Sequence, residues 1–138
     1  MEPQTTAGTT APKKVLCIED EHFISELYAR ALTKAGYQVD VQLDGRKGLA
    51  AAQTDVYDII LLDLMVPNIT GIEVLRTLRD PRLTPKMHAK IIITTNLEQR
   101  EDVRADIEQR ADGYLVKAEI TPHELVDILG RIDLSPPK

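Results

Sequence analysis

The sequence predicts an α/β fold in which helices cover both faces of a parallel five-stranded sheet. Short apolar runs alternate with amphipathic stretches along the chain, as in consecutive strand–helix units. The most continuous apolar run, Ile59–Leu62, is typical of a central strand buried on both faces. A length of 138 residues suits one domain and is too short for two ordinary ones.

The composition excludes several classes of protein. Apolar residues make up 43% of the chain and charged residues 28%, the balance of a soluble globular protein with a core. The net charge of −5 argues against a nucleic-acid or membrane surface, since both need a basic patch. No apolar run approaches the roughly 20 residues of a membrane span. The single cysteine, Cys17, lies in an apolar run and is expected to be a buried core residue in a reducing cytoplasm.

The first two strand–helix units are short. An apolar strand at 15–18 precedes a helix that begins at about His22 and that Gly36 ends, because glycine readily adopts the left-handed conformation of a helix end. The apolar face of this helix consists of Ile24, Leu27, Tyr28, Ala31 and Ala35. A strand at 39–41 and an alanine-rich helix at 46–53 form the second unit.

The third and fourth units follow the central strand. Pro67-Asn68 predicts a turn, because asparagine tolerates the left-handed region. Gly71 then opens a helix that Asp80-Pro81 stops. A β-branched strand at 91–94 leads to a helix at about 99–108 that has little to bury, chiefly Val103, Ala105 and Ile107.

The fifth unit pairs a strand at 114–116 with the helix that has the clearest start signal. Thr121 is placed to cap this helix, Pro122 lies in its first turn, and Glu124 can close a capping box. Its apolar residues have helical spacing, at Leu125, Ile128, Leu129 and Ile132.

The five units together are expected to form a domain that spans residues 13–134, with a disordered tail at 1–12 and a short tail at 135–138.

Polar residues follow four of the five strands at their carboxyl ends, where doubly wound sheets bind ligands. They are Glu19 and Asp20 after the first strand, Asp63 after the third, Thr95 after the fourth and Lys117 after the fifth. Three carboxylates, a hydroxyl and an ammonium are thus expected to share one crevice.

These groups suit phosphoryl transfer to a carboxylate. Each pair of like charges at about 4 Å costs on the order of 4 kcal/mol at an effective dielectric constant of 20, and a hard dication removes that cost. We expect Mg²⁺, or alternatively Mn²⁺, with Asp20 and Asp63 as direct ligands, the Met65 backbone carbonyl as a third, and Glu19 acting through water. Asp63 is then the nucleophile, while Lys117 and Thr95 neutralise and bind the phosphoryl oxygens.

The chain resembles the receiver domains of bacterial response regulators from about Lys13 to Leu134. The resemblance rests on Glu19-Asp20-Glu21, on Leu62-Asp63-Leu64-Met65-Val66-Pro67 with Gly71, on Thr95, and on Tyr114-Leu115-Val116-Lys117. It implies a flavodoxin-like fold with strand order 2-1-3-4-5 and five helices, as in stand-alone, chemotaxis-type receivers. It also implies a phosphoacceptor switch of a two-component system or phosphorelay, and no catalysis beyond its own phosphorylation and dephosphorylation.

The resemblance further implies partners and residue roles. A sensor histidine kinase, a histidine phosphotransfer protein or a small acyl phosphate would supply the phosphoryl group. Thr95 and Tyr114 would form the switch pair, and the Asn96 backbone would help to bind the phosphate. Met65 and Leu97 would flank the path of the hydrolytic water, so their apolar side chains predict a long-lived phosphoprotein. The face formed by the fourth helix, fifth strand and fifth helix would bind a downstream protein or a second copy of the chain.

Three positions depart from the family pattern. Ala118 replaces the proline that usually follows the lysine in a cis bond, so either a strained cis bond or a different backbone path is expected. Asn96 replaces a smaller residue and is expected to narrow access to the phosphate. Arg110 replaces a glycine at the end of the fourth helix, where a left-handed conformation would be strained.

Several alternatives remain. Residues 19–21 alone could be an ordinary helix N-terminus with Asp20 as the cap, and Thr94 competes with Thr95. Two other classes fail: a haloacid-dehalogenase-type phosphatase needs an aspartate where Met65 stands, and a flavin carrier needs a hydroxyl-rich phosphate loop where this chain has acids after the first strand. His22, His88 and His123 lack metal-ligand spacing. A pseudo-receiver that is not phosphorylated and acts as an interaction scaffold remains the serious rival.

Overall fold

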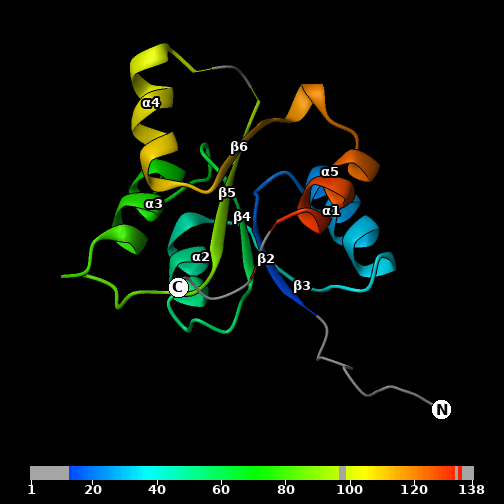
Figure 1. Cartoon of the computed structure of the whole chain (residues 1–138), viewed down its shortest axis with the longest axis horizontal. Helices are drawn as coiled ribbons and strands as arrows, with labels where there is room; N and C mark the ends of the chain where they lie inside the picture. The colour runs from blue at the N-terminus through cyan, green and yellow to red at the C-terminus, as the bar shows by residue number, and fades with distance from the viewer. Residues whose placement is uncertain (1–12, 97–98, 133, 135–138) are drawn as a thin grey trace.

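Five parallel strands form the centre of the molecule, as the computed structural model shows for residues 13–96, 99–132 and 134 (Figure 1). The strands are β2 (Lys14–Ile18), β3 (Gln38–Gln42), β4 (Ile59–Asp63), β5 (Lys90–Thr95) and β6 (Gly113–Val116). Their order across the sheet is β3-β2-β4-β5-β6, which is 2-1-3-4-5 in chain order. The predicted fold class is therefore confirmed.

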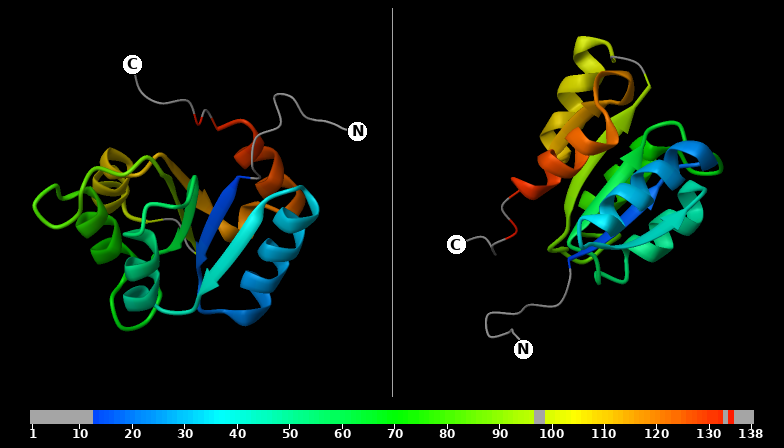
Figure 2. Two further views of the ribbon diagram at one scale, coloured as in Figure 1. Left: turned by 90° about the horizontal axis from the view of Figure 1, so that it is seen from below. Right: turned by 90° about the vertical axis from the view of Figure 1, so that its right-hand side faces the viewer.

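Helices cover both faces of this sheet (Figure 2). The described residues form α1 (His22–Lys34), α2 (Gly45–Ala52), α3 (Gly71–Arg79), α4 (Glu101–Arg110), α5 (Pro122–Gly130) and a short 3₁₀ turn, η1 (Lys117–Glu119). Helices α1 and α5 pack together on one face, and α2, α3 and α4 lie side by side on the other. Among the described residues, none of these helices has both the length and the apolar character needed to cross a membrane.

The sheet separates two apolar cores because alternate residues of a strand point to opposite faces. Leu16, Leu62 and Ile93 belong to the core beneath α2, α3 and α4. Cys17 and Leu61 belong to the core beneath α1 and α5. All five residues of β4 are buried, as predicted for the central strand. Cys17 is 1% exposed, as predicted for a core residue, and burial raises the pKa of its thiol to about 12.

Local signals in the sequence mark where α3 and α5 begin. Thr70 and Thr121 each form a complete capping box, with Glu73 and Glu124 as the respective partners. Asn68 adopts the expected left-handed conformation with a φ of 74°. Gly71 is needed for a different reason: a Cβ atom there would lie 2.2 Å from the Asp63 carbonyl oxygen. The glycine therefore lets α3 begin directly against the end of β4.

Several local expectations need correction. Arg110 is the last residue of α4 and is not strained, because the left-handed non-glycine residues of the described chain are Asp55 and Asn68. The buried face of α1 contains Leu32 and Ser25, while Ala35 is exposed at the C-cap.

Helix α4 begins at Glu101, two residues later than predicted, and Ala105 is exposed. The expected tails, 1–12 and 135–138, lie outside the described residues.

Candidate functional site

Three carboxylates meet at the carboxyl ends of β2 and β4. Glu19 directly follows β2, Asp63 ends β4, and these strands are neighbours in the sheet. Glu19, Asp20 and Asp63 each place a carboxylate oxygen within 4.8 Å of the others. Glu19 and Asp63 are only 1% and 2% exposed, whereas Asp20 faces solvent. The predicted convergence of these acids is thus present, with one of them at the entrance.

Lys117 supplies the positive charge of this acid cluster. Its Nζ atom donates to Glu19 Oε1 and lies 3.3 Å from Asp63 Oδ2. All peptide bonds of the described chain are trans, including Lys117–Ala118. Of the two routes left open by Ala118, the structure therefore takes the different backbone path: residues 117–119 form the turn η1, and the lysine side chain points from it into the cluster.

Burial and charge shift the pKa values of this pair. Burial raises the pKa of Glu19 to about 7, the charge of Asp63 adds to that rise, and the hydrogen bond from Lys117 opposes it. Burial disfavours the Lys117 ammonium, but its contacts with Glu19 and Asp63 outweigh that effect and raise the lysine pKa above its ordinary value. Lys117 thus contacts Glu19 and Asp63, and the remaining oxygen donors of the three-acid cluster suit a hard divalent cation.

Donors hold both oxygens of the Asp63 carboxylate. The Met65 backbone N–H donates to Oδ1 over 3.1 Å, and Lys117 approaches Oδ2. The Met65 side chain itself is 70% exposed. Asp63 is thus fixed in orientation at the end of a buried strand, and the Met65 side chain faces solvent between the buried residues Leu64 and Val66.

The N-terminus of α1 differs from the ordinary helix start weighed for residues 19–21. The N-cap is Glu21, not Asp20, and its side chain makes no capping hydrogen bond. The Glu21 backbone N–H instead donates to the Glu19 carboxylate over 3.1 Å. The carboxylate of Asp20 remains available to the acid cluster.

Gln99 contacts both Thr95 and Tyr114. The Gln99 side-chain amide donates to Thr95 Oγ1 over 3.2 Å, and its backbone N–H donates to the Tyr114 hydroxyl over 3.0 Å. The Arg104 guanidinium lies 4.6 Å from the centre of the Tyr114 ring. Sequence reasoning missed Gln99, because nothing in its type or spacing separates it from other polar loop residues.

The structure gives less information on three further predicted positions, Thr94, Asn96 and Leu97. Thr94, the rival of Thr95, pairs in register with Asp63, and both threonines are buried. Asn96 is exposed at the end of β5. Leu97 lies outside the described residues, so its predicted role stays a prediction.

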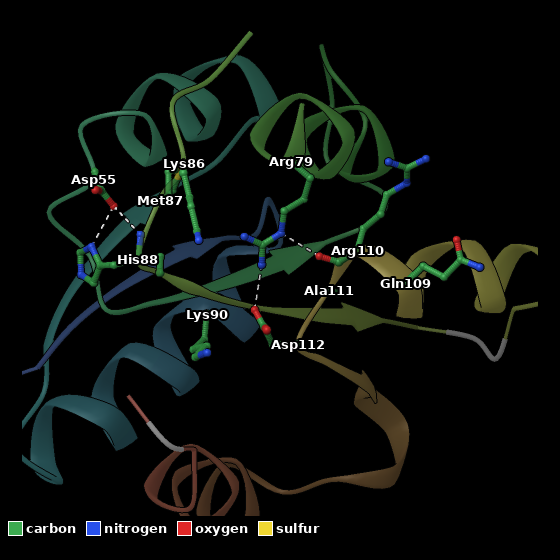
Figure 3. A pocket seen from close by; sticks show the side chains of 11 residues that line it. Asp55, Arg79, Lys86, Met87, His88, Lys90, Gln109, Arg110, Ala111 and Asp112 are labelled. Carbon is green, nitrogen blue, oxygen red and sulfur yellow. Dashed lines mark hydrogen bonds and ion pairs between the residues drawn. The ribbon is translucent and has the colours of Figure 1, made fainter. Parts of the chain in front are cut away.

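A groove of about 590 Å³ lies far from the acid cluster, at the amino ends of β5 and β6 (Figure 3). Arg79 crosses it and donates to the Arg110 carbonyl oxygen and to the Asp112 carboxylate. His88 bonds to Asp55 at the other side. These polar groups bond to one another, which is the arrangement of a structural junction between α3, α4 and β5.

Known proteins resemble this chain in both sequence and structure. A family model described as "Response regulator receiver domain" matches residues 15–130. "Response regulator ArlR" of Staphylococcus saprophyticus is 39% identical over 119 residues, which are 86% of this chain and 50% of that protein. The corresponding protein of Staphylococcus aureus is 37% identical over the same length. The chain therefore spans about half the length of the curated relatives it matches.

Two solved structures extend the likeness. Chemotaxis protein CheY4 of Vibrio cholerae shares 31% identity at a TM-score of 0.74, covering 88% of this chain and 98% of that one. Response regulator TrrA of Thermotoga maritima, described in complex with Mg(2+)-BeF, shares 32% identity at a TM-score of 0.71, covering 86% and 97%.

Proposed function

The chain belongs to the response regulator receiver domain family, as a phosphoacceptor switch of two-component signalling, and we propose that Asp63 is its phosphorylated residue. Domains of this kind are signalling switches and not metabolic enzymes. The assignment to Asp63 rests on one observation. Asp63 is the buried carboxylate that ends the central strand, with Lys117 at one of its oxygens and the Met65 N–H at the other.

The proposed reaction transfers a phosphoryl group from a phosphohistidine to Asp63. A carboxylate oxygen of Asp63 attacks the phosphorus, the P–N bond to the imidazole breaks, and a P–O bond forms. The imidazole leaves with the electron pair of that bond and takes up a proton. A carboxylate nucleophile needs no base, so positioning and charge neutralisation are what the protein must provide. Lys117 supplies an ammonium beside the nucleophile.

The residues present fit a bound Mg²⁺, or Mn²⁺ in its place. Asp20 and Asp63 would be direct ligands with the Met65 carbonyl, and Glu19 would act through water, since its carboxylate already accepts from Lys117. When bound, the cation neutralises charge on the carboxylates and on the phosphoryl oxygens. The description of TrrA as a complex with Mg(2+)-BeF supports this assignment by analogy.

Phosphorylation is proposed to be read through Thr95 and Tyr114. The Thr95 hydroxyl and the Asn96 backbone N–H would bind phosphoryl oxygens, and the Tyr114 ring would change its position in response. The change would appear on the face formed by α4, β6 and α5. A downstream protein or a second copy of the chain would bind there, and a histidine kinase or phosphotransfer protein would be the donor. We propose no nucleic-acid or membrane partner for this domain.

Incubation with acetyl phosphate and Mg²⁺ tests the assignment. The wild type should gain one phosphoryl group that hydroxylamine removes, and Asp63→Asn should gain none. Asp127→Asn, which changes an exposed aspartate on α5, serves as the matched control and should behave like wild type. A phosphoryl group retained in Asp63→Asn would place the acceptor elsewhere. A wild type that gains none, and that binds no beryllofluoride, would favour the scaffold function instead.

A further inference from the structure

Gln99 contacts both members of the proposed switch pair, and we propose that it is the positioning residue that couples Thr95 to Tyr114. The inference rests on the proposed function of that pair. It adds a residue that the motifs of the sequence did not indicate, and it assigns separate roles to the side chain and the backbone of that residue.

The contacts of Gln99 with Thr95 and with Tyr114 differ in what a substitution can remove. The contact with Thr95 uses the side-chain amide, which donates to Oγ1 over 3.2 Å. The contact with Tyr114 uses the backbone N–H, which donates to the phenol oxygen over 3.0 Å and which every residue except proline retains. A substitution at position 99 can therefore break the link to Thr95 and leave the link to Tyr114 in place.

The amide orients the Thr95 hydroxyl in a way that suits phosphate binding. A hydroxyl has one proton to donate and two lone pairs that accept. Since the Gln99 amide donates into a lone pair of Oγ1, this contact does not itself use the threonine proton, and it is compatible with a hydroxyl that donates to a phosphoryl oxygen. Thr95 is 1% exposed at the end of β5, so few rotations are open to it. A movement of Thr95 toward the phosphate would thus pull on the amide of Gln99.

The position of Gln99 would transmit this movement to α4 and to Tyr114. It stands directly before Arg100, the N-cap of α4, so it joins the end of β5 to the start of this helix. Arg104, in the first half of α4, lies over the Tyr114 ring. Gln99 and Arg104 therefore contact the hydroxyl and the ring of the same tyrosine, and a shift of residue 99 that moves the start of α4 would change both contacts.

The first test needs no phosphate. Tyrosine would be replaced by 3-fluorotyrosine, and the ¹⁹F signal of Tyr114 would be assigned by its loss in Tyr114→Phe. Thr95→Val removes the hydroxyl and keeps the branched shape, so it should shift this signal in the wild-type background. In the Gln99→Met background, which keeps the side-chain length without a donor, the same change should move the signal by less than half as much. Equal shifts in the two backgrounds would overturn the coupling.

A matched control comes from elsewhere in the molecule. Gln53 donates to Thr84 Oγ1 over 3.0 Å, a glutamine–threonine bond of the same kind away from β5 and α4. Gln53→Met should leave the response of Tyr114 to Thr95→Val at its full size. Gln99→Ala provides a second background, and both Gln99 variants should keep the wild-type circular dichroism spectrum. A loss of the response in Gln53→Met as well would show a general loosening and would refute the specific role.

The second test adds beryllofluoride and Mg²⁺. In wild type, binding should shift the Tyr114 signal. In Gln99→Met, binding should persist with an affinity lowered by no more than about tenfold, the value of one hydrogen bond, while the Tyr114 shift is largely lost. A full Tyr114 shift in Gln99→Met would contradict the proposal. If wild type binds no beryllofluoride, the proposed phosphoacceptor function fails. The first test, which needs no phosphate, still decides whether Gln99 couples Thr95 to Tyr114.

Discussion

Replacing Asp112 with alanine should destabilise the fold by about 2 to 3 kcal/mol, although the residue is far from the acid cluster. Its carboxylate oxygen Oδ2 accepts two hydrogen bonds of 2.8 Å each, from the Ile91 backbone N–H and from Arg79. Ile91 is fully buried near the start of β5, and the Asp112 N–H donates back to the Ile91 carbonyl. Asp112 therefore closes the edge of the sheet where β6 begins (Figure 3).

The free-energy cost of Asp112→Ala is the sum of the contributions from its two partners, Ile91 and Arg79. A buried backbone N–H that loses its acceptor costs about 1 to 3 kcal/mol, so Ile91 accounts for most of the effect. The pair with Arg79 joins side chains that are 34% and 26% exposed, which limits its contribution to about 0.2 to 1 kcal/mol. Arg79→Met should therefore cost clearly less than Asp112→Ala, because it leaves the bond to Ile91 intact.

Urea denaturation of wild type, both single variants and the double variant measures these values. The double variant should cost about as much as Asp112→Ala plus the loss of the Arg79 bond to the Arg110 carbonyl. Asp127→Ala is the control for removing an exposed aspartate and should change stability by less than about 0.5 kcal/mol. A cost for Asp112→Ala below about 0.5 kcal/mol, or an equal cost for Arg79→Met, would refute the reasoning.

Three further predictions concern the acid cluster, the pH dependence and the phosphorylated state. Asp63→Asn should raise the melting temperature in EDTA by about 3 °C, because it removes one of the three clustered carboxylates. Added Mg²⁺ should stabilise this variant less than wild type, and a lower melting temperature in EDTA would contradict the reasoning. Burial and a 2.6 Å hydrogen bond to Asp40 raise the pKa of Tyr57 from 10.0 to about 12. The protonated Tyr57 hydroxyl therefore stabilises the fold fully below pH 10, and this stabilisation is lost as the pH rises through 12. The difference in unfolding free energy between wild type and Tyr57→Phe should shrink across that interval, and a constant difference would count against the assignment. Met65→Asn should shorten the lifetime of the phosphorylated protein severalfold, measured as loss of phosphoryl mass, since an amide can orient a hydrolytic water; an unchanged lifetime would mean that water arrives by another route.

The fold could be predicted because its signals are local. The apolar run of β4 and the capping boxes at Thr70 and Thr121 depend on residues close together in the chain. The convergence of Glu19, Asp63 and Lys117 followed from one general rule, that parallel strands bring their carboxyl ends to the same edge.

The features that sequence reasoning missed depend on contacts between distant segments. Arg110 read alone suggested a strained helix end, but its carbonyl oxygen accepts from Arg79, which is 31 positions away. The sequence gives no sign of the role of Asp112, because only the folding of β5 places the Ile91 N–H beside its carboxylate. The path of Lys117 could be narrowed only to two choices, because the conformation after Ala118 depends on how η1 packs.

The anchoring of α4 explains why a single hydrogen bond could matter to the proposed switch. Of the ten residues of this helix, only Ile107 is buried, so apolar burial holds it weakly. Its later part is fixed by polar contacts with α3, from Arg76 to Asp106 and from Arg79 to the Arg110 carbonyl. Its start has the connection through Gln99 to Thr95. We therefore expect phosphorylation to move the first turn of α4, because the Gln99–Thr95 bond before this turn lies nearest to the phosphate. The last turn should stay in place, because Arg79 holds it through the Arg110 carbonyl and the neighbouring Asp112.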